Sequence, residues 1–417
     1  MPNLTKDPSV LEITDKIAKN ASSGRYVVSD AIVREGGREY QYVDLVLEGG
    51  GTLGIALVGY IHALEQAGIR FLGIGGSSVG AIVALLAYSC GGRDEAKGEK
   101  LAAMVSELNL SELVDGKFFA RGLSRLMGNR HARLRKARIQ AGILINLPLL
   151  FNRFGLNPGD KLFEWITAKM AENGVRTLED LNKLVAALPK GLTNRETGEP
   201  ITEYDTSLRI VTADITTSTK VVFPDMAAMY WQNPDAVNPA CFARAASSIP
   251  GFFQPFTVEG ISNLIGKSEK WEQLGNFTGP LPNRVMFADG GLMSNFPIDL
   301  FKRIGVPKAP TFGARLGKNQ RTVKDTDKLW VYAYRLFTAL QHYADYDFIY
   351  KNQMYRHLIT YINTDRYNWL DFNMDEAKML GLFREGVFAA HKFLDTFDWA
   401  QHKKQRTAEA EASRRSC

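Results

Sequence analysis

Short apolar runs alternate with apolar residues at helical spacing in the first quarter of the chain. The run Val43–Leu47 predicts a strand, and the apolar positions from Leu53 to Ala67 predict a helix. A second strand over Ile69–Ile74 and a second helix over Val79–Tyr88 follow. Strand, helix, strand and helix with short connections predict a right-handed parallel βαβ unit, and hence an α/β fold.

The rest of the chain divides into regions by the same patterns. Residues 1–40 are polar, with a short helix expected near Val10–Lys19. Other expected elements are a helix at Lys161–Asn173 and strands at Leu208–Ala213, Lys220–Phe223, Val285–Ala288 and Thr311–Leu316. We therefore expect an N-terminal arm (1–40), an α/β domain (41–316) with a helical, basic insertion at about 94–200, a helical, aromatic-rich region (317–401) and a charged, disordered tail (402–417).

One segment resembles a membrane span in length. Phe71–Cys90 holds no charged residue, but a Gly-Gly-Ser-Ser cluster interrupts it, which favours a strand, a tight turn and a buried helix. The N-terminal Met1–Asn20 is mixed in charge and lacks the apolar core of a signal peptide. We expect a cytoplasmic protein without a signal peptide or transmembrane helix, with peripheral membrane association.

The composition is that of a globular protein, with 417 residues, 45% hydrophobic and 23% charged. The cysteines Cys90, Cys241 and Cys417 are too few for a disulfide framework, which favours a reducing compartment. The net charge is +6, but residues 116–159 contain no acidic residue and nine basic ones, so the rest of the chain carries −3. The placement of charge is therefore more informative than its sum.

The basic stretch is followed by an apolar run, Ile143–Phe151. One interpretation is a surface that docks on anionic membranes or caps a cleft; another is a solvated basic helix packed against acidic residues, with the apolar run buried. Nucleic acid is not expected as a partner, because no known nucleic-acid-binding module accompanies the charge. The residues proposed for membrane contact are Arg121, Arg125, Arg130, Arg133, Arg135, Lys136 and Arg138.

Gly76-Ser77-Ser78-Val79-Gly80 forms a G-x-S-x-G motif between a predicted strand and a predicted helix. This is the context of a nucleophile elbow, in which Gly76 and Gly80 leave room for a sharp turn that exposes the Ser78 hydroxyl. The helix dipole would also favour negative charge developing there. The alternative is an ordinary Gly/Ser-rich loop.

A second glycine loop, Gly49-Gly50-Gly51-Thr52-Leu53-Gly54, also lies between a strand and a helix. Consecutive glycines let backbone amides point into one concavity, which suits either a nucleotide phosphate or an oxyanion hole. A dinucleotide site would need an acidic residue about 20 positions later. That region has none and leads into the Ser78 turn, which favours the oxyanion hole.

Asp289-Gly290-Gly291 follows the predicted strand Val285–Ala288. One interpretation is that the Asp289 carboxylate faces a cleft at the end of the strand; the alternative is that Asp289 only begins a turn. The histidines that follow Asp289, namely His342, His357, His391 and His402, are not in glycine-rich loops after strands, and His62 lies on a predicted helix. Without a histidine base, the carboxylate itself must accept the serine proton, as a Ser–Asp dyad.

Together these motifs resemble the patatin-like phospholipases. The resemblance rests on residues 47–54, Gly76–Gly80 and Asp289–Gly291, in the same order and strand contexts, and on Ala245–Pro255 upstream of the aspartate. It covers about residues 42–316. It implies a three-layer α/β fold with a central, mostly parallel sheet flanked by helices, to which the insertion and the C-terminal helical region are additions.

The resemblance also implies a function. Ser78 would be the nucleophile, Asp289 the base, and the amides of Gly49, Gly50 and Gly51 the oxyanion hole of a calcium-independent hydrolase acting on phospholipids or other lipid esters, with no cofactor or metal. Gly54, Gly76, Gly80, Gly290 and Gly291 would be the motif glycines. Leu53 departs from the family, which often has Lys or Arg there, and this puts the head-group preference in doubt. The alternatives are a catalytically silent lipid-binding or scaffold protein on the same fold, and a nucleotide-binding protein that uses Gly49–Gly54.

Overall fold

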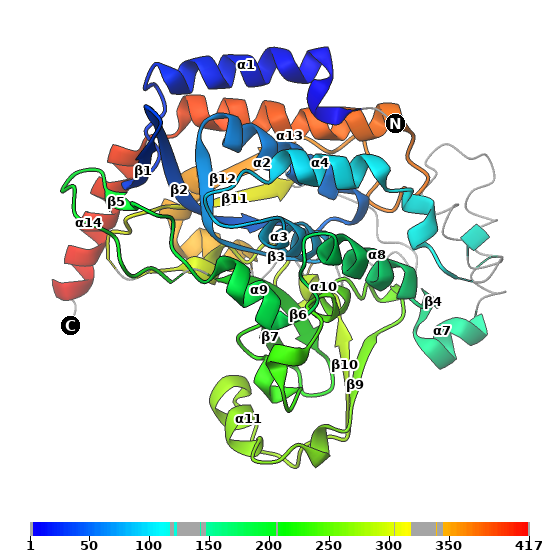
Figure 1. Ribbon diagram of the computed structural model, residues 1–417. Coiled ribbons are helices and arrows are strands. Elements are labelled where there is room, and N and C mark those ends of the chain that lie inside the picture. Colours follow the sequence, from blue (N-terminus) through cyan, green and yellow to red (C-terminus); the bar gives the residue numbers. More distant parts are fainter. Residues whose placement is uncertain are drawn as a thin grey trace.

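The computed structural model describes residues 3–116, 121, 122, 142, 147–205, 207–303, 305–317, 339 and 345–415. Within these residues, a mixed sheet of ten strands forms the centre of the molecule (Figure 1). Its main path runs through β12 (Ile359–Ile362), β11 (Thr311–Leu316), β2 (Arg38–Leu47), β3 (Ile69–Ser77), β6 (Leu208–Asp214), β10 (Arg284–Ala288) and β9 (Phe256–Glu259). The five strands from β12 to β6 are parallel, whereas β10 and β9 are antiparallel to their neighbours.

The remaining strands branch off this path or lie beside the sheet. In the sheet they are β1 (Ala31–Glu35), β5 (Thr193–Asn194) and β7 (Thr219–Phe223), all paired antiparallel. A separate parallel pair consists of β4 (Gly155–Asn157) and β8 (Gly251–Phe253).

Helices cover the sheet. They are α1 (Pro8–Ser22), α2 (Gly54–Gln66), α3 (Val79–Ser89), α4 (Gly98–Glu107), α7 (Leu147–Arg153), α8 (Asp160–Ala171), α9 (Leu178–Val185), α10 (Ala240–Ala246), α11 (Ser268–Gly275), α13 (Glu376–Thr396) and α14 (Trp399–Arg415). Helices α2 and α3 pack on the sheet, α13 packs on α2, and α1 lies along α13 (Figure 1). The fold is thus a mostly parallel central sheet flanked by helices, with C-terminal helices, as expected.

The glycines of β3 show how closely the layers approach. A Cβ on Gly73 or Gly75 would lie within 3 Å of Phe301 or Leu300, in the short 3-10 helix η8 (Ile298–Phe301). A Cβ on Gly76 would instead lie 2.7 Å from the carbonyl carbon of Gly80 in α3. Since side chains alternate along a strand, η8 and α3 lie on opposite faces of β3.

The βαβ unit predicted from the apolar pattern is confirmed. Strands β2 and β3 are parallel, and α2 connects them. The span-like segment Phe71–Cys90 is most of β3, a turn and α3, as its glycines predicted. Among the described residues, no helix combines the length and apolarity that crossing a membrane requires.

The structure differs from the sequence-based expectations at the C-terminus. Residues 402–415 of the expected disordered tail belong to α14, and polar side chains anchor that helix. The Arg406 guanidinium is buried and donates to the carbonyl oxygens of Arg303 and Gly305, both at 2.6 Å. Strand β12 was not predicted and continues the sheet beyond residue 316, so the expected domain boundaries remain a proposal.

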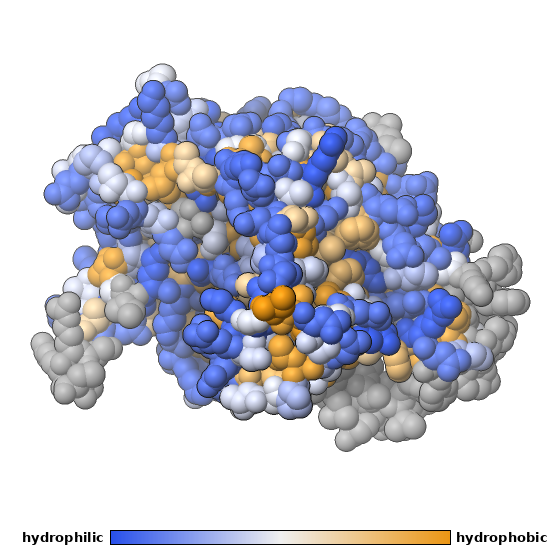
Figure 2. All heavy atoms as spheres, turned by 60° about the horizontal axis from the view of Figure 1, so that its bottom comes forward, coloured by the Kyte–Doolittle hydropathy of each residue, from blue (hydrophilic) through white to orange (hydrophobic). Residues whose placement is uncertain are grey.

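The surface view in Figure 2 shows the face that carries α11. Hydrophilic side chains dominate it, and apolar ones appear as separate patches between them. Scattered apolar patches are normal on a globular surface.

Candidate active site

Ser78 occupies a strained turn between β3 and α3. Its backbone has φ 51° and ψ −126°, a conformation that L-residues rarely adopt. The flanking glycines are required by space: a Cβ on Gly80 would lie 2.3 Å from the Leu47 carbonyl oxygen, and one on Gly76 would lie 2.6 Å from it. The two glycines of the G-x-S-x-G motif therefore make room for the sharp turn that was predicted at Ser78.

Asp289 lies at the end of β10 and faces Ser78. The Ser78 hydroxyl donates to Oδ2 of Asp289 at 2.7 Å, and the amide of Gly291 donates to Oδ1 at 2.9 Å. Both side chains are buried. Gly290 has no room for a Cβ, which would lie 2.0 Å from the carbonyl oxygen of Val211. The structure thus brings together two residues that are far apart in the sequence.

The Asp289 carboxyl is poised to accept a proton near neutral pH. Burial raises the pKa of Asp289 to about 6, while the hydrogen bonds from Ser78 and Gly291 act in the opposite direction. A carboxylate in this range is a far stronger base than an exposed one, and it is still largely ionised at pH 7.

The residues upstream of Asp289 fix its position. The Asp289 amide donates to the Ser248 carbonyl oxygen at 2.9 Å. The buried Arg244 guanidinium donates to the Ser248 hydroxyl at 2.8 Å and to carbonyl oxygens of Pro158 and Gln254. Ser248 lies in the Ala245–Pro255 segment noted in the sequence, but no sequence signal marked Arg244 as its support.

The glycine loop lies directly beside Ser78. A Cβ on Gly49 would lie 2.9 Å from the Cβ of Ser78, so the loop approaches the serine as closely as a backbone can. The Gly49 amide donates to the Asn295 carbonyl oxygen at 3.0 Å. Within the described residues, the amides of Gly50 and Gly51 have no acceptor. Two of the three amides expected to form the oxyanion hole are therefore available.

A buried ion pair holds the strand that leads into this loop. Glu48 is almost fully buried. Its carboxylate accepts a hydrogen bond of 3.0 Å from the Arg315 guanidinium. Burial raises the pKa of Glu48, and Arg315 opposes that rise. Neither Glu48 nor Arg315 was singled out from the sequence, because their pairing depends on β2 and β11 being neighbours.

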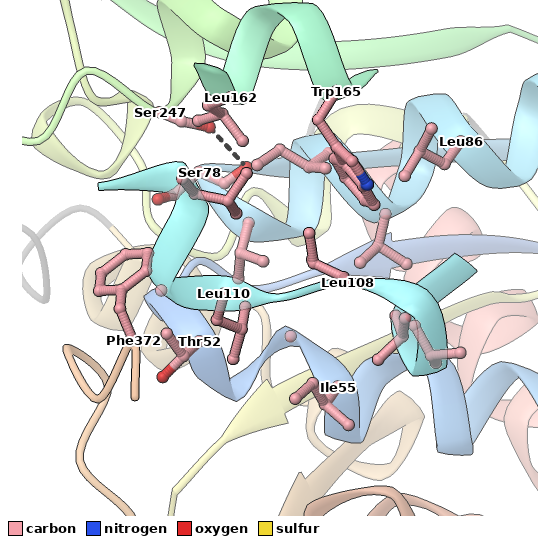
Figure 3. Close-up of a pocket in the computed structure, with 18 of the residues that line it drawn as sticks. Thr52, Ile55, Ser78, Leu86, Leu108, Leu110, Leu162, Trp165, Ser247 and Phe372 are labelled. Atoms are coloured by element: carbon pink, nitrogen blue, oxygen red, sulfur yellow. Dashed lines mark hydrogen bonds between the residues drawn. The ribbon is translucent and has the colours of Figure 1, made fainter. Parts of the chain in front are cut away.

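An apolar pocket of about 100 Å³ begins at Ser78 (Figure 3). Among the described residues that line it, the polar side chains are Thr52, Ser78 and Ser247. Figure 3 shows Ser78 and Ser247 joined by a hydrogen bond at one end, with Trp165 and Leu86 toward the other. Helices α2, α3, α4 and α8 contribute most of the apolar wall.

The candidate histidines lie elsewhere in the described part of the chain. His62 is buried in α2, and burial lowers its pKa to about 4. His357 and His402 bond each other at 2.7 Å, and His391 lies 3.6 Å from Asp395. His342 lies outside the described residues. Among the described residues, the hydrogen bonds to the Asp289 carboxylate come from Ser78 and Gly291, not from a histidine.

Of the other predicted site residues, some are described by the structure and some are not. Gly54 lines the pocket, and Leu53 is buried in the short 3-10 helix η2 (Gly51–Leu53). Arg121 is exposed beside a second cavity. Outside the described residues lie Arg125, Arg130, Arg133, Arg135, Lys136 and Arg138. Within the described residues, no cluster of three or more His, Cys, Asp or Glu side chains is arranged to hold a metal ion.

Comparison with known proteins identifies the family. The chain is similar to the uncharacterized protein YqhO of Bacillus subtilis (strain 168), with 28% identity over 361 residues, covering 85% of this chain and 98% of that protein. VipD from Legionella pneumophila has a similar structure, with 15% sequence identity and a TM-score of 0.41, over 95% of this chain and 80% of VipD. The complex of ExoU and SpcU from the type III secretion system of Pseudomonas aeruginosa matches with 16% identity and a TM-score of 0.34, over 90% of this chain and 60% of that one. The model of the patatin-like phospholipase family matches residues 45–302, more than half of the chain. The chain therefore belongs to the patatin-like phospholipase family.

Proposed function

We propose that the protein is a serine-dependent lipid acyl hydrolase, of the phospholipase A or lysophospholipase type. The observation that carries this proposal is the 2.7 Å hydrogen bond from Ser78 to Asp289 at the end of an apolar pocket. A nucleophile with its own base, placed where an acyl chain can be buried, suits hydrolysis of an ester with a long apolar acyl group.

In the proposed mechanism, Asp289 accepts the proton of the Ser78 hydroxyl while the serine oxygen attacks the ester carbonyl carbon. The amides of Gly50 and Gly51 donate to the resulting oxyanion. The carbon–oxygen bond to the alcohol then breaks, and Asp289 returns the proton to the departing alcohol. In the second half, Asp289 accepts a proton from water, the hydroxide attacks the acyl-serine, and the proton returns to Ser78 as the fatty acid leaves.

The pocket and the family support the proposed substrate class. A pocket lined mainly by aliphatic and aromatic side chains favours an acyl chain over a polar one. We propose that the protein acts without a bound cofactor or calcium, on the basis of the family resemblance, and expect activity to survive a chelator. Peripheral membrane contact remains a proposal that rests on the basic residues of the segment 116–159.

Covalent labelling with a fluorophosphonate probe tests the proposal, because such probes react with activated serines. We expect Ser78→Ala to abolish labelling, and Ser78→Ala and Asp289→Asn each to lower ester hydrolysis by roughly 10³-fold or more. Ser77→Ala is a matched control, since the Ser77 hydroxyl is buried next to Ser78 and has no partner among the described residues. This control should keep its label.

The same experiment separates the alternative function, a catalytically silent lipid-binding or scaffold protein. That alternative predicts a folded wild-type chain in which Ser78 is not labelled and esters are not hydrolysed, although lipids bind. Full hydrolysis by the Asp289→Asn variant would instead eliminate the dyad while leaving Ser78 as a possible nucleophile.

A further inference from the structure

The turn between β12 and α13 reaches the mouth of the active site, although it lies outside the family-matched residues 45–302. The amide and the hydroxyl of Thr52 both donate to the Trp369 carbonyl oxygen, at 2.9 and 3.2 Å. Gly51, which has φ +56°, leaves room for that oxygen, because a Cβ there would lie 2.2 Å from it. The glycine loop therefore holds this turn in place.

Phe372 fixes the same turn from the other side. Its ring stacks on Phe252 with centroids 5.1 Å apart and meets the edge of Phe253 at 6.3 Å. Only 8% of Phe372 is exposed. Since Phe252 and Phe253 belong to β8, the turn spans from the glycine loop to β8 as a fixed wall. Figure 3 shows Phe372 and Thr52 at the same end of the pocket as Ser78.

Two cavities of different polarity meet at Phe372, one almost wholly apolar and the other lined by both polar and apolar side chains. One is the apolar pocket that contains Ser78. The other has a volume of about 310 Å³, and its lining includes Ser111, Glu112, Arg121, Lys161 and Asn373. Phe372 lines both cavities. An apolar chain is more stable in the first, and a polar or charged group loses less hydration in the second.

We propose that Phe372 is a specificity-determining residue that separates the acyl side of the substrate from its alcohol side. The acyl chain lies in the apolar pocket, and the leaving alcohol with its polar head group lies beyond the Phe372 ring, toward Arg121 and Lys161. The size of the ring then limits which alcohols can be accommodated. This inference rests on the proposed hydrolase function and assigns a role to the C-terminal region.

The test compares two esters with the same acyl chain, a methyl ester and a lysophosphatidylcholine, both kept monomeric. We expect Phe372→Ala to raise the kcat/KM ratio of the large-alcohol ester over the methyl ester about tenfold, and Phe372→Trp to lower it, mainly through KM. Phe388→Ala is the control, because Phe388 is 54% exposed on α13 and should leave the ratio unchanged.

The outcomes are distinguishable. An equal ratio in wild type, Phe372→Ala and Phe372→Trp, with fluorophosphonate labelling of Ser78 intact, would overturn the role of Phe372 alone. If Phe372→Ala does not fold, Phe372→Leu and Phe372→Trp should still shift the ratio in opposite directions, and failure to do so would overturn it equally. A wild-type chain that hydrolyses neither ester would overturn the proposed function, and this inference with it.

Discussion

At the scale of single residues, Asp289 combines two properties that usually exclude each other. It is 2% exposed, yet the proposed mechanism needs its carboxylate charged. Burial disfavours the charged form and raises the pKa of Asp289 to about 6, and two hydrogen bonds keep the charged form accessible. The residue is thus a stronger base than a solvated aspartate without being neutral at pH 7.

This predicts the pH dependence of activity. Below pH 6 the protonated Asp289 cannot accept the Ser78 proton, so kcat/KM should fall about tenfold per pH unit, and above pH 6 it should level off. To test this, kcat/KM for an uncharged soluble ester is measured as a function of pH between 4.5 and 8. A profile that stays nearly level down to pH 4.5, as a solvated aspartate with a pKa of about 3.9 would give, would show that a buried Asp289 is not the titrating base.

Gly51 provides a second prediction, for which the chain offers a matched control. Gly51 and Gly36 have nearly the same φ, +56° and +57°, but a Cβ on Gly51 would lie 2.2 Å from the Trp369 carbonyl oxygen, whereas one on Gly36 would meet nothing within 4 Å. Gly36→Ala should therefore cost about 1–2 kcal/mol of unfolding free energy from backbone strain alone. Gly51→Ala should cost more and should also lower kcat.

Denaturant unfolding and ester kinetics of the two variants check this prediction. Because Gly51 also offers an amide to the proposed oxyanion, displacement of the loop should reduce kcat by roughly 10²-fold or more. Equal stability loss and equal activity in both variants would contradict the claim that the loop is held against the C-terminal turn.

At the scale of elements, the sequence was informative wherever the signal was local. The segments around Ser78 and Asp289 were predictable because an apolar run followed by a glycine-flanked polar residue marks a strand end on its own. Arg244, Asn295 and Phe372 were not predictable in the same way. Their roles come from contacts between segments distant in sequence, such as Phe372 on Phe252, and neither periodicity nor spacing carries that information.

The contact between α2 and α13 is another such case, and it yields a prediction. A Cβ on Gly386 would lie 1.9 Å from the Ala56 carbonyl oxygen, which is backbone and cannot move alone. Helix propensity by itself would make Gly386→Ala stabilising by about 1 kcal/mol. We expect the clash to dominate, so that the variant loses about 2–3 kcal/mol of unfolding free energy.

Gly381→Ala on the same helix is the control for Gly386→Ala. There the nearest atom to an added Cβ is the phenolic oxygen of Tyr367, 2.4 Å away, at the tip of a side chain that can shift. Thermal and denaturant unfolding should therefore show a change within about 1 kcal/mol. If Gly386→Ala is as mild as Gly381→Ala, the two helices are not packed as closely as the structure indicates.

At the scale of the whole molecule, the C-terminal region is part of the same folded body as the α/β domain rather than an appendage. Strand β12 extends the sheet, α13 packs on α2, and the turn between them reaches the glycine loop. Composition misled the sequence-based expectation for residues 402–415, because polar contacts, such as those of Arg406, help to fix α14.

The distribution of charge over the whole chain yields a prediction about binding to anionic membranes. Residues 116–159 carry nine basic and no acidic residues, while the rest of the chain is slightly acidic. Each basic residue near an anionic membrane surface contributes about 1 kcal/mol of attraction. Replacing Arg125, Arg130, Arg133 and Arg135 with Gln should therefore weaken binding to anionic vesicles by at least tenfold, or about 1.4 kcal/mol, and the loss should shrink at high salt.

A second variant with the same change in net charge separates local docking from overall attraction. It replaces four exposed basic residues spread over the body, Arg34, Lys16, Lys183 and Lys351. If residues 116–159 form the docking surface, vesicle cosedimentation and the ratio of vesicle to monomeric-ester hydrolysis should fall for the first variant and much less for the second. Equal losses would mean that overall charge, and not this segment, brings the protein to the membrane, because long-range attraction depends on the whole field of the molecule.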